Sequence, residues 1–79
     1  MIWIDKNGAL EKEFILNSFS EIILKLQVLA LIADKLNHHP DFTVKDYNKI
    51  IFHLKTHDQG NSVTEKDIQL SKEIDNLFK

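Results

Sequence analysis

The sequence predicts an α+β fold, in which a four-stranded antiparallel sheet carries two helices on one face. Two segments with an apolar period of about 3.6 residues are each preceded by two short strand-like segments. The resulting order is strand, strand, helix, strand, strand, helix, which is typical of an antiparallel sheet covered by helices on one side. A length of 79 residues predicts one domain, spanning residues 1–79.

The first two strands are predicted on either side of a tight turn at Asn7-Gly8. Both residues tolerate positive φ, which a type I′ hairpin turn requires. A short apolar and aromatic segment, residues 1–4, precedes this turn, and residues 9–16 follow it with apolar side chains mostly at even spacing. Even spacing places side chains on one face of a strand, so we expect one face of this hairpin to be buried.

A long helix is predicted from Ser20 to Leu36. Ser18 and Glu21 have the capping-box spacing that opens a helix. Apolar residues follow the helical period, and others widen the apolar surface well beyond one stripe: Leu24, Val28, Leu31 and Ile32. Because a helix that is apolar on so many sides needs two partners, we expect the sheet on one side and a second helix or another subunit on the other.

Two more strands are predicted at residues 41–44 and 49–57, with a polar turn between them. In the second of these strands, alternation places Thr56 on the same face as the larger apolar side chains. Residues 64–67 then repeat a capping-box-like spacing. The closing helix that follows carries apolar residues at i, i+4, i+7 and i+8, namely Leu70, Ile74, Leu77 and Phe78.

The composition argues against several classes of protein. The net charge is -2 and all ten basic side chains are lysines, which disfavours a nucleic-acid partner. The chain has no cysteine, so disulfides and thiolate metal sites are excluded and a cytoplasmic location is allowed. Asp5 and Lys6 interrupt the first apolar run, and no apolar stretch reaches the roughly 18 residues of a membrane span. We therefore expect no signal peptide, no membrane partner and a cytoplasmic protein.

Three of the four histidines, His38, His39 and His57, lie in one segment and suggest either a metal site or acid–base chemistry. Adjacent histidines rarely point the same way, which disfavours a shared metal ion. His53 and His57 would share one strand face at about 13 Å, which is too far for one ion. The histidine pattern therefore makes metal ligation the weaker interpretation.

Acid–base chemistry has better local support at His38. This residue follows the predicted end of the first helix, where the partial negative charge stabilises a protonated imidazole. Asp34 lies one helical turn earlier and could orient the same imidazole. The simpler interpretation is that His38 only caps the helix and His39 is an exposed loop residue. Composition by itself favours that simpler interpretation.

The wider spacing resembles the motif of the pterin-4a-carbinolamine dehydratases, from Trp3 to the end of the chain. That motif has an acidic residue, a His-His-Pro tripeptide, an aromatic residue, a third histidine and a later aspartate. The matching residues here are Asp34, His38-His39-Pro40, Tyr47, His57 and Asp67.

This resemblance implies a hydro-lyase that dehydrates 4a-hydroxytetrahydropterin to quinonoid dihydropterin and water. Such an enzyme recycles tetrahydropterin and uses neither a metal nor an organic cofactor. The implied catalytic residues are His38, His39 and His57. The implied substrate contacts are Asp34, Pro40, Phe42, Thr56, Asp58 and Gln59. The resemblance also implies a homodimer or homotetramer, which we expect to form through the Ser20–Leu36 helix and the sheet edges.

Two points separate this sequence from the usual family pattern. Family members commonly begin with a further N-terminal helix, which we expect to be absent here, and the loop between His57 and Thr64 is about one residue longer than the family pattern predicts. Phe42 also stands where tryptophan is common. The alternative function is a non-catalytic regulatory module that binds a pterin or dimerises a protein through the apolar helix face. An intact helix face with an inactive pocket would favour that alternative.

Overall fold

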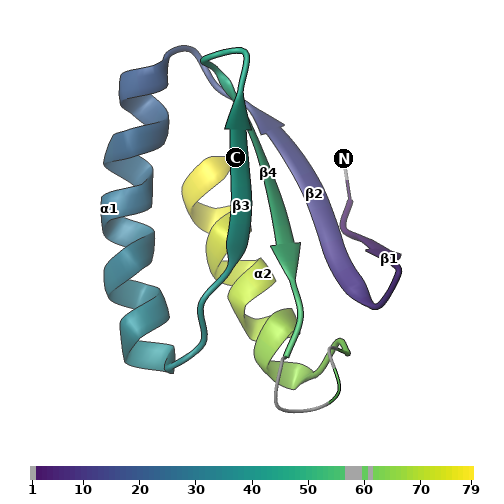
Figure 1. The fold of residues 1–79 in the computed structure, drawn as a ribbon. Coiled ribbons are helices and arrows are strands. Elements are labelled where there is room, and N and C mark those ends of the chain that lie inside the picture. The colour runs from purple at the N-terminus through teal and green to yellow at the C-terminus, as the bar shows by residue number, and fades with distance from the viewer. Residues whose placement is uncertain (1, 57–59, 61) are drawn as a thin grey trace.

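The computed structural model describes residues 2–56, 60 and 62–79. It contains a four-stranded antiparallel sheet with the order β1-β2-β4-β3 and two helices on one face of that sheet, which confirms the predicted fold class (Figure 1). The elements are β1 (Ile4–Lys6), β2 (Ala9–Ile15), α1 (Phe19–Leu36), β3 (Asp41–Lys45), β4 (Lys49–Leu54) and α2 (Glu65–Phe78). Among the described residues, neither helix is both long and apolar enough to cross a membrane.

One apolar core fills the space between the sheet and the helices. The central strand β4 contributes alternate residues to it, because successive side chains of a strand point to opposite faces. Phe52 lies at the centre of this core and contacts the rings of Phe14, Phe42 and Phe78. The buried apolar residues are Phe14, Leu16, Ile22, Leu29, Ala33, Ile50, Phe52, Leu54, Leu70, Ile74 and Phe78. Burying each of the larger ones contributes about 1.5–3 kcal/mol.

The first strand lies later in the chain than residues 1–4. The hairpin turn at Asn7 and Gly8 forms as predicted, with φ of 56° and 81°. Its register pairs Lys6 with Ala9, so the strand must adjoin the turn. Trp3, which precedes this strand, packs its ring against the core and contacts the ring of Phe14 edge-on.

The last strand is shorter than residues 49–57. Regular pairing of β4 ends at Leu54, and Thr56 makes an isolated bridge to Ser62 beyond it. Thr56 nevertheless continues the buried face of β4, as the alternation predicted. The predicted strand residue His57 lies outside the described residues.

A left-handed residue ends α1 and directs the chain toward the sheet. Asn37 has φ 54° and ψ 41°, and its N–H bonds to the carbonyls of Ala33 and Asp34. The N–H of His38 also reaches the carbonyl of Ala33 at 3.1 Å, which completes a Schellman motif. These bonds fix the backbone of His38 relative to α1. At the other end of α1, Ser18 acts as N-cap, so the helix begins slightly earlier than predicted.

Candidate active site

The imidazole of His38 forms a short hydrogen bond to a buried carboxylate. Its Nε2 lies 2.6 Å from Oδ1 of Asp67, in the first turn of α2. The other oxygen, Oδ2, accepts from the Thr56 hydroxyl at 2.8 Å and from the Thr64 N–H at 2.9 Å. Asp67 therefore connects the end of α1, the chain after β4 and the start of α2. These partners replace the hydrogen bonds to water that the carboxylate loses on burial.

The imidazole of His39 pairs with a different carboxylate, near the surface. Its Nε2 lies 2.8 Å from Oδ1 of Asp34, and both side chains are exposed. The predicted pairing of Asp34 with His38 is therefore wrong. The left-handed turn at Asn37 is the physical reason. After this turn His38 points inward to α2, while the side chain of His39 reaches back to the last turns of α1.

Both imidazoles line one polar cavity of about 340 Å³. Four of the residues that line it were predicted as site residues from the sequence, and three were not. The described lining residues are Asn37, His38, His39, Pro40, Asp41, Thr56 and Lys66. Each of the two adjacent histidines that line this cavity is held through Nε2 by its own carboxylate, His38 by Asp67 and His39 by Asp34.

A second, mainly apolar cavity of about 240 Å³ adjoins the first. Asp34 and Phe42, which were also predicted as substrate contacts, line this second cavity rather than the polar one. His39 and Pro40 line both. The full described lining is Leu26, Leu29, Ala30, Ala33, Asp34, His39, Pro40 and Phe42. The described part of the predicted site is therefore divided between two compartments.

Three predicted residues cannot be placed in either cavity. The predicted catalytic residue His57 and the predicted contacts Asp58 and Gln59 lie outside the described residues. Two other residues discussed from the sequence lie elsewhere. Tyr47 is exposed in the turn between β3 and β4, and His53 faces Glu11 across the uncovered face of the sheet at 3.1 Å.

Asp67 is the main site residue that was not selected from the sequence. Its position in the family motif and its capping-box spacing were both visible, but no local pattern indicates that the first turn of α2 faces His38. Lys66 was missed for the same reason, since it joins the cavity only through tertiary contact, whereas Asp41 directly follows Pro40 in the sequence and was not selected. The sequence signal for Asp67 was its capping-box position at the start of α2, because a helix start beside a strand end forms a polar cluster.

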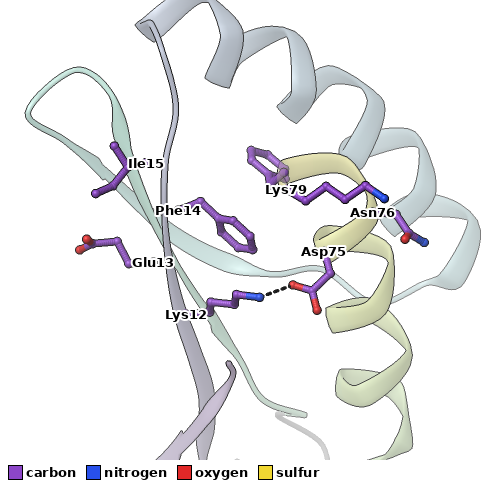
Figure 2. Close-up of a pocket in the computed structure, with 8 residues that line it drawn as sticks. Lys12, Glu13, Phe14, Ile15, Asp75, Asn76 and Lys79 are labelled. Carbon is purple, nitrogen blue, oxygen red and sulfur yellow. Dashed lines mark hydrogen bonds and ion pairs between the residues drawn. The ribbon is translucent and has the colours of Figure 1, made fainter. Parts of the chain in front are cut away.

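Another cavity, of about 460 Å³, lies at the other end of α2, and Figure 2 shows residues that line it. None of the described residues predicted for the site lines this cavity. Lys12 and Asp75 point toward each other there, with Nζ 2.7 Å from Oδ1, and the Trp3 indole donates to the same oxygen at 3.1 Å. This cluster connects β2 to α2, and no histidine is among the described residues that line the cavity. The histidine-lined cavity is therefore the better candidate for catalysis.

Comparisons with known proteins agree with the spacing of the motif. A family model described as pterin 4 alpha carbinolamine dehydratase matches residues 2–77. A Sulfurisphaera tokodaii protein, provisionally named a pterin-4-alpha-carbinolamine dehydratase, is 43% identical over 76 residues, or 96% of this chain and 80% of the relative. A Metallosphaera sedula protein with the same provisional name is 44% identical over 77 residues, or 98% of this chain and 78% of the relative.

Solved structures with the same fold include one at higher and one at lower sequence identity. The structure of a transcriptional coactivator/pterin dehydratase from Brucella melitensis has a TM-score of 0.89 at 30% identity, covering 98% of this chain and 82% of that one. A pterin dehydratase-like protein, described as a RuBisCO assembly factor in the alpha-carboxysome, has a TM-score of 0.73 at 18% identity. It covers 96% of this chain and 86% of that one, and at this identity it supports the fold alone.

Proposed function

This chain belongs to the pterin 4 alpha carbinolamine dehydratase family, and we propose that it dehydrates 4a-hydroxytetrahydropterins to quinonoid dihydropterin and water. One observation carries this proposal beyond family membership. His38 and His39 line the same cavity, and each is held through Nε2 by its own carboxylate. The site thus offers two oriented imidazoles to one bound molecule.

The reaction needs two proton transfers. An imidazolium donates a proton to the hydroxyl on C4a, and that hydroxyl leaves as water. A second, neutral imidazole takes the proton from N5, whose electrons form the C4a=N5 double bond. Both transfers occur near neutral pH with groups whose ordinary titration range is close to it, which is why imidazole suits each role. The net change is the loss of one water molecule, from the C4a hydroxyl and the N5 proton, so the step requires no oxidant.

The carboxylates determine which nitrogen exchanges protons with the substrate. An ionised carboxylate only accepts hydrogen bonds, so Nε2 carries a proton in both pairs. We infer that Nδ1 of each imidazole is then the atom that exchanges a proton with the substrate. The conformations of Asn37 and Pro40 fix the direction in which the histidines enter the cavity.

The remaining predicted residues complete the proposed site. We assign His57 as a third imidazole, and Asp58 and Gln59 as substrate contacts, on the motif alone. Thr56 supports the cavity through its hydroxyl, which binds Asp67. Further proposals retained from the sequence are recycling of tetrahydrobiopterin in the cytoplasm, action without a cofactor, and a homo-oligomeric assembly.

The decisive experiment follows the ultraviolet decay of 4a-hydroxytetrahydropterin with and without the protein. We expect wild-type protein to accelerate the decay. His38→Ala and His39→Ala should each lower kcat/KM by about 10²-fold or more, because general acid–base groups contribute at that level. His53→Ala is the matched control, since this histidine lies on the uncovered sheet face. Decay at the spontaneous rate with folded wild-type protein would sink the proposal.

A second candidate function is a protein-binding regulatory module. The favouring observation is an exposed apolar row on α1, formed by Leu24, Val28 and Leu31. The Brucella melitensis structure is described both as a coactivator and as a dehydratase, which is consistent with either function for this chain. The module is supported if His38→Ala still captures a protein partner and Val28→Asp does not. If the wild-type protein is also inactive on pterins, the module is the better interpretation.

A further inference from the structure

A series of hydrogen bonds continues from Asp67 away from the histidines and ends at the residue that precedes α2. The hydroxyl oxygens of Thr56 and Thr64 lie 2.6 Å apart, and the Thr56 hydroxyl donates to Oδ2 of Asp67 at 2.8 Å. The opposite oxygen of Asp67 binds Nε2 of His38. Thr64 is therefore connected to His38 through two other side chains, although it is not among the described residues that line either histidine cavity.

The hydrogen bonds of this network can point in only one direction when Asp67 is ionised. A carboxylate accepts and never donates, so the single hydroxyl proton of Thr56 is committed to Oδ2 of Asp67. The oxygen of Thr56 can then only accept from Thr64, so the Thr64 hydroxyl is the donor of the 2.6 Å bond. On the other side of the carboxylate, His38 donates through Nε2. The four side chains therefore have one compatible arrangement of protons.

Burial makes each member of the network depend on the next one. Thr56 and Asp67 are only 2% and 0% exposed, so water does not replace a missing donor there. In the part of the chain that the structure describes, every buried side-chain nitrogen and oxygen has a hydrogen-bond partner. A buried network that is fully satisfied holds its members in one arrangement, whereas a missing member leaves a desolvated group without a partner. Loss of the Thr64 hydroxyl would therefore disturb Thr56 first and Asp67 next.

We propose that Thr64 is a positioning residue of the dehydratase site, and that its hydroxyl holds the His38 imidazole through Thr56 and Asp67. This inference rests on the proposed function, since it gives His38 the role of exchanging a proton with the pterin. The bond from Thr64 keeps the Thr56 hydroxyl directed at Oδ2 of Asp67, and the carboxylate then presents Oδ1 to the imidazole. The start of α2 in this way determines how firmly a ring beyond the end of α1 is held.

Two substitutions of Thr64 separate its hydroxyl from its shape. Thr64→Val keeps the branched side chain but removes the donor, whereas Thr64→Ser keeps the donor. Because Thr64 is also the N-cap residue of α2, Thr64→Val should lose some stability for that reason alone. Ser18→Ala is the matched control. Ser18 caps α1 by accepting from the N–H of Glu21, and no hydrogen bond connects it to the histidines.

The first measurement is the steady-state dehydration of 4a-hydroxytetrahydropterin per molecule of folded protein. We expect Thr64→Val to lower kcat roughly 3–30-fold, the usual size for a substitution within a coupled network, with little change in KM because Thr64 does not touch the pterin. Thr64→Ser and Ser18→Ala should both keep most of the wild-type kcat. In a His38→Ala background, Thr64→Val should have no further effect, because Thr64 acts only through this imidazole.

The second measurement follows the His38 ring without using activity. An Nε2–H that is held against a buried carboxylate exchanges slowly with water, so its proton resonance in isotope-labelled protein reports whether the ring is held. We expect this resonance in wild type, Thr64→Ser and Ser18→Ala, and faster exchange in Thr64→Val. His39 is the internal reference for fast exchange, because its pair with Asp34 is exposed.

The two measurements separate this inference from the proposed function. If wild type is active, an unchanged kcat or an unchanged Nε2–H exchange in folded Thr64→Val would overturn the role of Thr64. An equal loss of kcat in Thr64→Ser would also overturn it, since that variant keeps the donor. Faster Nε2–H exchange in Thr64→Val, in a protein whose wild type does not accelerate dehydration, would support the hydrogen-bond network and contradict the enzymatic proposal. Unchanged exchange in such an inactive protein would overturn both.

Discussion

At the scale of single residues, the two histidine–carboxylate pairs have the same chemistry but different surroundings. Asp67 is fully buried and accepts three hydrogen bonds from His38, Thr56 and Thr64. Asp34 is exposed beside His39, and water can replace its partner. A buried group left without its partner costs its full desolvation, whereas an exposed pair contributes little to stability. The same substitution should therefore have unequal effects at the two positions.

Asp67→Asn should lower the free energy of unfolding by about 1–3 kcal/mol, because an amide presents one acceptor oxygen where the carboxylate presents two. It should also lower kcat/KM by about 10–100-fold, because the Asp67 carboxylate orients His38. Removing a contact that orients an active-site side chain usually has an effect of this size. Asp34→Asn should change stability by less than about 0.5 kcal/mol. Urea unfolding and pterin decay measure the two quantities. Equal stability losses in both variants would contradict this account of Asp67.

At the scale of elements, the end of α1 determines where both imidazoles lie. Asn37 adopts a left-handed conformation, which costs most L-residues about 1–2 kcal/mol and glycine almost nothing. We expect Asn37→Gly to preserve stability and dehydratase activity. Asn37→Val should lower the unfolding free energy by about 1–2 kcal/mol. It should also lower the activity of the folded protein, because the direction of His38 changes. Full activity of a folded Asn37→Val protein would show that the turn does not position the site.

A second element-level contact connects β2 with α2. The side chain of Lys12 is mostly buried, and its Nζ lies 4.8 Å from the centre of the Phe14 ring and pairs with the half-exposed Asp75. Removing the carboxylate leaves a buried cation, whereas removing the cation leaves Asp75 with the Trp3 indole and water. Asp75→Ala should therefore cost about 1–3 kcal/mol, and Lys12→Met less than about 1 kcal/mol. Chemical unfolding of both variants tests this order, and a larger loss for Lys12→Met would reverse the interpretation.

At the scale of the whole molecule, local patterns predicted the architecture better than the site. The Asn7-Gly8 turn, the Ser18 cap and the alternation of β4 are encoded within a few residues, so they could be recognised directly. The contact between His38 and Asp67 joins residues 29 positions apart, and no local period carries that information. Asp34 was identified as a histidine partner, but the wrong histidine was chosen because the left-handed turn was not anticipated.

Part of the exposed surface of α1 is apolar although it contributes neither to the core nor to the cavities. Leu24, Val28 and Leu31 are 64%, 47% and 72% exposed and lie at i, i+4 and i+7, so they form one row on the side of the helix away from the core. Contiguous exposed apolar surface of this kind marks association sites. This row supports the proposed homo-oligomer through the Ser20–Leu36 helix more directly than the short sheet edges do.

If α1 mediates this assembly, Leu31→Asp should shift the protein to monomers in sedimentation velocity at micromolar concentration, because each contact would then bury an unpaired charge. Gln69→Asp, an exposed position of α2, is the control and should leave the assembly intact. A monomeric wild-type protein, or an unchanged assembly in Leu31→Asp, would contradict the prediction. Leu31 lines neither of the two histidine cavities. The Leu31→Asp monomer should therefore keep most of its dehydratase kcat/KM, which separates the role of the helix surface in assembly from that of the cavities in chemistry.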